Sequence, residues 1–103
     1  ELTKYIHNVF GAYKVTYFNA AKEYVEKMGG DWAKVHTGVL LSGYINDTHT
    51  YVPGPDGKFG YGGKCFPKDV NAFAQMTQGT SMGTLLAPLH DLNVHFRGTE
   101  ERI

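Results

Sequence analysis

Residues 59–69 read Phe-Gly-Tyr-Gly-Gly-Lys-Cys-Phe-Pro-Lys-Asp, a glycine-rich loop that leads into the predicted start of a helix. Pro67 suits the first helical position, because its φ is already helical and its missing N–H needs no partner there. Cys65, the only cysteine of the chain, would then lie one or two residues before the helix N-terminus. The helix dipole, the unpaired N–H groups and the two flanking lysines would favour the reactive thiolate. A buried structural cysteine is the alternative, and this stretch alone leaves both open.

The first 28 residues predict one long helix. Apolar side chains recur there every three or four positions, and Gly29-Gly30 would end the helix. The apolar stripe is too wide for one contact face. We therefore expect the rest of the domain to cover one side of this apolar stripe, and a second subunit is a candidate to cover the other.

The rest of the chain predicts a small all-α domain, with three shorter helices added to the long one. Trp32 and Val35 are expected to face the core from the second helix. Residues 42–64 show no sustained period, and a loop of this length is usually functional or disordered. Pro88 either starts the last helix or kinks it. The shorter helices are expected at residues 32–41, 67–78 and 85–96.

Length and charge limit the possible classes of protein. A chain of 103 residues forms one small domain or part of a larger protein. Ten basic residues balance ten acidic ones, which argues against a nucleic-acid binder that relies on bulk charge. One cysteine excludes an intrachain disulfide, and without a signal peptide or a membrane-length apolar run the expected location is the cytoplasm. Because the sequence opens inside a helical pattern, we expect a fragment or a minimal domain.

Lys4, Asn8 and Asp69 are further candidates for chemistry. Lys4 and Asn8 are four residues apart, hence neighbours on one helix face, where they could stabilise a developing oxyanion. On local grounds an exposed polar face is the simpler interpretation. Asp69 falls in the first turn of the predicted third helix, where a structural acid is favoured by the dipole and a general base is the alternative.

The sequence predicts neither a metal site nor a cofactor fold of its own. Its five histidines show no ligand spacing and no partnering cysteine pair. The glycines at 60–63 do not match GxGxxG, and no strand precedes them.

Three motifs taken together resemble one family. They are Glu-Leu-Thr-Lys-Tyr-x-x-Asn-x-Phe at 1–10, Tyr-Phe-Asn at 17–19 and Gly-Tyr-Gly-Gly-Lys-Cys-Phe-Pro-Lys-Asp at 60–69. They resemble the central domain of the UDP-glucose/GDP-mannose 6-dehydrogenases, and Leu92-Asn93 fits the last helix of that domain. The resemblance covers nearly the whole chain, and the block around Cys65 is highly specific.

The resemblance implies a function in nucleotide-sugar oxidation. Family members oxidise a primary alcohol to a carboxylate, as from UDP-glucose to UDP-glucuronate, in a four-electron reaction that uses two NAD⁺ and no metal. Cys65 would attack the intermediate aldehyde, and a thiohemiacetal and then a thioester would follow. Lys4 and Asn8 would stabilise the oxygen on the reacting carbon, Asp69 would assist proton transfer, and Lys68 would support the site. The implied sugar-nucleotide pocket comprises Gly60, Tyr61, Gly62, Gly63 and Tyr51.

Two departures from the family pattern follow. The N-terminal Rossmann domain that binds NAD and the C-terminal nucleotide-binding domain are absent from this sequence, so it is not expected to turn over alone. Ser42 and Tyr44 stand where the family usually carries Asp-x-Arg, which puts the usual substrate in doubt. The family's long central helix builds its dimer interface, so a homodimer is predicted. The alternative hypothesis is a stand-alone helical dimerisation or sugar-nucleotide-binding module without catalytic activity.

Overall fold

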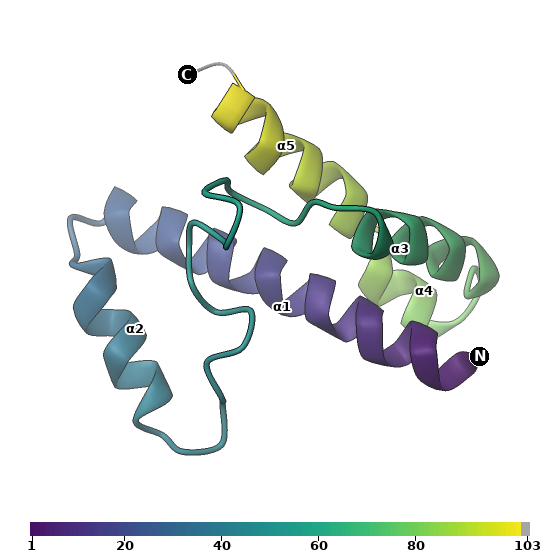
Figure 1. Ribbon diagram of the computed structural model, residues 1–103, viewed down its shortest axis with the longest axis horizontal. Helices are drawn as coiled ribbons and strands as arrows, with labels where there is room; N and C mark the ends of the chain where they lie inside the picture. Colours follow the sequence, from purple (N-terminus) through teal and green to yellow (C-terminus); the bar gives the residue numbers. More distant parts are fainter. Residues whose placement is uncertain (102–103) are drawn as a thin grey trace.

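The computed structural model describes residues 1–101, with side chains through residue 98, and this range is all-helical with one long N-terminal helix (Figure 1). The predicted fold class is thus confirmed. No strand occurs within the described range. The helices are α1 (Leu2–Lys27), α2 (Trp32–Leu40), α3 (Cys65–Met76), α4 (Ser81–Leu86) and α5 (Leu89–Glu101).

Helix α1 is the central element: α3, α5 and α2 pack on it, and α4 packs mainly on α3. Helices α3 and α4 gather at its N-terminal half, α2 lies near its C-terminal end, and α5 extends toward its C-terminal half, where His95 Nε2 lies 2.9 Å from Glu23 Oε2 (Figure 1). Tyr5 of α1 stacks on Phe73 of α3, with ring centroids 5.5 Å apart and planes 1° from parallel. Burying a side chain such as Phe73 contributes about 2–3 kcal/mol to stability. The main buried cluster comprises Val9, Ala12, Tyr61, Val70, Phe73, Leu86 and Leu89.

A second apolar face of α1 remains exposed. Its large side chains are separated by four or seven residues, so they form one stripe along the helix. Each is more than half exposed in the single chain. The stripe consists of Leu2, Ile6, Phe10, Tyr17, Tyr24 and Met28.

Helix α2 buries a different side chain from the one predicted. Asp31 caps it, its carboxylate accepting from the Lys34 N–H at 3.4 Å. Val35, expected in the core, is 40% exposed, whereas His36 is buried. The reason is that His36 stacks on Trp32 and hydrogen-bonds a buried threonine of the following loop, residues 41–64.

Helix α3 begins two residues earlier than predicted. Lys64 already has a right-handed helical backbone (φ −95°, ψ −39°), so Cys65 is the first helical residue rather than lying before the helix. Pro67 is therefore third, where a missing N–H still breaks no intrahelical bond. Asp69 consequently lies in the second turn, not the first.

The predicted helix over 85–96 is in fact two helices, which brings the shorter helices of the described range to four. The Thr80 hydroxyl caps α4 by accepting from the Gly83 N–H at 3.2 Å. Gly79 (φ 83°) is the break before α4, but Ser81 to Gly83, also predicted to be non-helical, belong to it. Pro88 directly precedes α5, which begins one residue after the start predicted at Pro88, and the proline does not kink a continuous helix. No helix in residues 1–101 is both long enough and apolar enough to cross a membrane.

Candidate functional site

A partly buried polar contact joins α1 to α3. Asn8 Nδ2 donates to Asp69 Oδ2 at 2.9 Å, across 61 positions of sequence. Asp69 is only 1% exposed. Because a carboxylate only accepts, the contact turns the amide nitrogen of Asn8 toward α3. The second N–H of that amide remains for another acceptor.

The other predicted catalytic residues lie around this contact. Lys68 Nζ is 3.9 Å from Asp69 Oδ1 and is largely exposed, so their ion pair is weak. Lys4 lies one turn before Asn8 on α1, and Cys65 lies one turn before Asp69 on α3; both are exposed. Neither makes a side-chain hydrogen bond or ion pair within the described residues. The structure thus brings Asn8, Asp69 and Lys68 together and leaves Lys4 and Cys65 open to solvent.

A cavity of about 590 Å³ lies between the loop, α1, the start of α3 and α5. Its volume is in the range of small-molecule sites. All five residues predicted for the sugar-nucleotide pocket line it, together with Phe66, which directly follows Cys65. The complete lining is Val15, His49, Tyr51, Pro53, Gly54, Pro55, Asp56, Gly60, Tyr61, Gly62, Gly63, Phe66 and Arg97.

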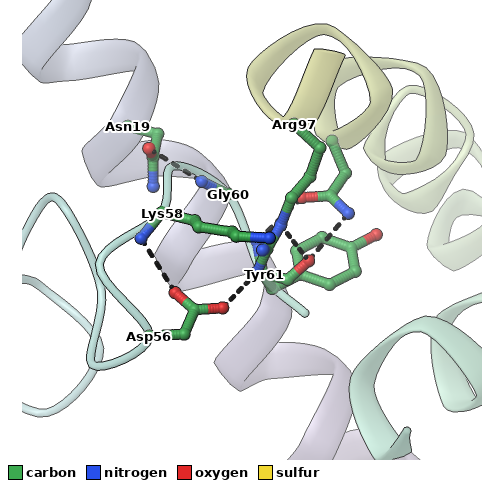
Figure 2. A network of polar contacts seen from close by, with 7 residues as sticks. Asn19, Asp56, Lys58, Gly60, Tyr61 and Arg97 are labelled. Atoms are coloured by element: carbon green, nitrogen blue, oxygen red, sulfur yellow. Dashed lines mark hydrogen bonds and ion pairs between the residues drawn. The ribbon is translucent and has the colours of Figure 1, made fainter. Parts of the chain in front are cut away.

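Two asparagines hold the glycine-rich segment of the loop in place. Asn93 of α5 hydrogen-bonds both backbone polar groups of Tyr61. Its Oδ1 accepts from the Tyr61 N–H at 2.8 Å, and its Nδ2 donates to the Tyr61 carbonyl at 2.9 Å. Asn19 of α1 accepts from the Gly60 N–H at 3.0 Å (Figure 2). These side chains satisfy the backbone groups of a segment that has no helix or strand of its own.

Arg97 completes this network. Its Nε donates to the Tyr61 carbonyl at 3.1 Å, and a terminal nitrogen donates to Asp56 Oδ2 at 3.0 Å (Figure 2). A Cβ added to Gly62 would lie 2.8 Å from Arg97 Cζ. A side chain at position 62 would therefore have to displace the Arg97 guanidinium from its contacts with Tyr61 and Asp56.

Charge and burial shift two pKa values in this network. The Lys58 backbone N–H holds the pKa of Asp56 below its ordinary value, with a smaller contribution from Arg97. Asp56 therefore stabilises the fold above its unfolded-state pKa, and that contribution is lost as pH falls through the lower folded value. Solvent screens the effect, because the carboxylate is about half exposed. Burial raises the pKa of Tyr61 to about 12, so its hydroxyl keeps its proton at neutral pH.

The sequence reasoning missed the residues that shape the loop. Asn19 and Asn93 could have been noticed as polar residues close in sequence to apolar residues that are buried, Phe18 and Phe96. Both asparagines were named from the sequence only as part of the family motifs. Arg97 carried none, since it follows the predicted end of the last helix. Tyr44, which stands in the usual arginine position, is 85% exposed and does not line the cavity.

The described residues offer no evident site for a metal ion or a dinucleotide. No three His, Cys, Asp or Glu side chains in that part of the chain gather closely enough to hold a metal. It also contains no strand from which a glycine turn could lead into a helix N-terminus, the arrangement that binds dinucleotides.

Comparison with known proteins identifies the family. The central domain of the UDP-glucose/GDP-mannose dehydrogenase family matches residues 1–93. The UDP-glucose 6-dehydrogenase of Rhizobium meliloti (strain 1021) is 40% identical over 78 residues, which are 76% of this chain and 17% of that protein. Two UDP-glucose 6-dehydrogenases of Bacillus subtilis (strain 168) are also similar: TuaD at 35% over 78 residues and YwqF at 36% over 76, covering 76% and 74% of this chain and 16% of each relative.

These matches span less than a fifth of the length of each relative. No solved structure matches the chain. The family match extends over nearly all of the helical domain described above, including α1, the loop and α3. The chain therefore belongs to the UDP-glucose/GDP-mannose dehydrogenase family.

Proposed function

We propose that this chain is the central domain of a UDP-glucose 6-dehydrogenase and supplies its catalytic cysteine. The observation that carries the proposal is the hydrogen bond from Asn8 to Asp69. It joins the motif of residues 1–10 to the motif of residues 60–69, one helical turn from Cys65. The substrate class follows from the three named relatives, each a UDP-glucose 6-dehydrogenase.

In this proposal Cys65 is the nucleophile. Its thiolate Sγ adds to the carbon of the sugar aldehyde, the S–C bond forms, and the carbonyl π electrons move onto the oxygen. Its position as the first residue of α3 places the thiol at the positive end of a helix. Lys64 and Lys68 add positive charge on either side. Its exposure leaves the sulfur accessible to a substrate.

Asn8 and Lys4 are the groups proposed to stabilise the resulting oxyanion. Asn8 has one N–H on Asp69 and a second one free to donate, while Lys4 offers an ammonium group one turn away. Donors already oriented before the reaction stabilise a developing charge most effectively, and losing one typically costs about 10²–10³-fold in rate. Asp69 fixes the Asn8 amide and is the carboxylate proposed to accept a proton, with Lys68 offsetting its charge.

NAD is the proposed hydride acceptor, which would take four electrons in two transfers. The described residues contain no strand that leads through a glycine turn into a helix, so this chain is proposed to bind the sugar nucleotide and to carry the thiol. The cavity beside Phe66 is the proposed position of that substrate. It is large enough for part of a nucleotide sugar and opens next to the cysteine-bearing end of α3.

We also propose that a second copy of the chain covers the exposed stripe of α1. The stripe runs the length of the helix, and a soluble chain rarely leaves such a continuous apolar face open to water. Ile6 and Phe10 of this stripe border a hollow of about 240 Å³, whose walls continue onto α3 and α4. A hollow that continues an apolar stripe can receive side chains of a partner helix.

Sedimentation velocity tests the dimer. In the full-length protein, Tyr17→Glu should weaken self-association by at least about tenfold, because a charge would be buried in an apolar contact. Tyr44→Glu is the control, since Tyr44 is also an exposed tyrosine, at 85% against 63% for Tyr17, but lies off the stripe. A monomeric unaltered protein, or equal weakening by both substitutions, would argue against a dimer formed through α1.

Ligand protection of the thiol tests the substrate. Saturating UDP-glucose should slow iodoacetamide alkylation of Cys65 in the full-length protein by at least about fivefold, because the occupied cavity adjoins the first turn of α3. The modified peptide is quantified by mass spectrometry, with GDP-mannose and free glucose as comparison ligands. Protection by GDP-mannose alone would replace the proposed substrate, and no protection by either nucleotide sugar would refute the site.

A further inference from the structure

His49 has an unusual backbone conformation at the edge of the cavity. It is the only non-glycine residue in the described range with a positive φ, 65°. It occupies the third position of a turn in which the Thr50 N–H donates to the Asp47 carbonyl at 3.1 Å. A residue with a side chain pays about 1–2 kcal/mol for this left-handed conformation, so its surroundings must enforce it.

A buried hydrogen-bond chain clamps this turn to α2. Thr50 is fully buried, and its hydroxyl donates to the Asp47 carbonyl at 2.8 Å. Because a hydroxyl has one hydrogen, Thr50 must accept at its other contact, His36 Nε2 at 2.8 Å. His36 therefore carries a proton on Nε2. The hydrogen bonds of Thr50, the next residue, thus hold the backbone of His49 in this conformation.

The turn presents the imidazole of His49 to the cavity. The ring meets Phe66 edge-on, with centroids 5.3 Å apart, and Phe66 directly follows Cys65. Its nitrogens make no hydrogen bond within the described residues. Partial burial lowers the pKa of His49, and Lys14 and His7 on α1 lower it further. The ring is therefore neutral at neutral pH, with one nitrogen donating and the other accepting.

We propose that His49 recognises a hydroxyl group of the nucleotide sugar. This inference rests on the proposed function and assigns one polar contact within its cavity. A hydroxyl both donates and accepts, and so matches a neutral imidazole, whereas a phosphate oxygen only accepts. The ligand offers such hydroxyls on its glucosyl ring and on its ribose.

Titration calorimetry with UDP-glucose and with UDP tests the assignment on the full-length protein. His49→Gly removes the ring and keeps the turn, because glycine takes a positive φ without strain. It should weaken UDP-glucose binding by about tenfold, the value of one hydrogen bond, without lowering the melting temperature. His49→Asn, which also tolerates this φ but is shorter, should show a similar loss. Thr48→Ala, in the same turn but outside the cavity, is the control and should bind normally.

The two ligands identify the hydroxyl. A loss for UDP-glucose alone assigns a glucosyl hydroxyl, and an equal loss for UDP that disappears with 2′,3′-dideoxy-UDP assigns a ribose hydroxyl; either supports the inference. An equal loss for UDP that persists with the dideoxy ligand would place the contact on a phosphate or the base and overturn the inference. Unchanged affinity of both His49 variants for both ligands would overturn it and leave the proposed function standing. An unaltered protein that binds neither ligand would overturn both.

Discussion

A Cys65→Ser variant of the full-length protein is expected to lose at least about 10³-fold in the rate of UDP-glucose-dependent NADH formation. A serine hydroxyl stays protonated near neutral pH, so it cannot replace the thiolate that adds to the aldehyde. The loss should appear in kcat, because the sulfur acts on the reacting carbon rather than holding the rest of the substrate. NADH absorbance over a series of UDP-glucose concentrations separates kcat from KM.

The fold should survive this substitution. Cys65 is exposed, and serine is well tolerated at a helix start, so the melting temperature should change little. Gln75→Ala, at an exposed position of the same helix, is the matched control and should keep full activity. A serine variant that retains about a tenth or more of the activity would exclude Cys65 as the nucleophile.

The long helix was predictable because its signal is repeated many times. Apolar residues recur over seven turns of α1, and Gly29-Gly30 end the pattern clearly. The start of α3 was mispredicted because the preference of proline for the first position is statistical, and Pro67 fits equally well at the third. Helix α4 has only six residues, too few for a periodic signal, and helices so short depend on tertiary contacts. Met82 and Leu86 supply those contacts in the core.

The candidate site also has a part that the sequence predicts and a part that it does not. The family resemblance named both Asn8 and Asp69, and the structure brings the two side chains into contact, while their chemical roles stay a prediction. The path of residues 41–64 was not predictable, since that segment has no period and is positioned by side chains remote in sequence. Arg97 and Asn93 act from α5, and His49 depends on a turn that buried Thr50 clamps to α2. Local sequence rules do not encode such contacts.

An Asn8→Asp variant should lose about 2–4 kcal/mol of folding free energy near neutral pH. The substitution places a second carboxylate against Asp69, which is almost fully buried. In the unaltered protein, Asp69 accepts a hydrogen bond from the Asn8 amide. Two carboxylates at hydrogen-bond distance cannot both stay ionised without a large cost. Asn8→Ala is the matched control; it removes the donor without adding charge and should cost about 1–2 kcal/mol.

The pH dependence of stability separates this repulsion from simple loss of packing. In the folded Asn8→Asp variant the pair holds a proton that the unfolded chain has released at the same pH. The folded state therefore binds more protons, and its stability rises as the pH is lowered from about 7 to about 5. Urea unfolding at both pH values should show the Asp variant approaching the Ala variant at the lower one. Equal stabilities of the two variants near neutral pH would mean that Asp69 does not face position 8 in solution, and the proposed support of Asn8 by that carboxylate would fail with it.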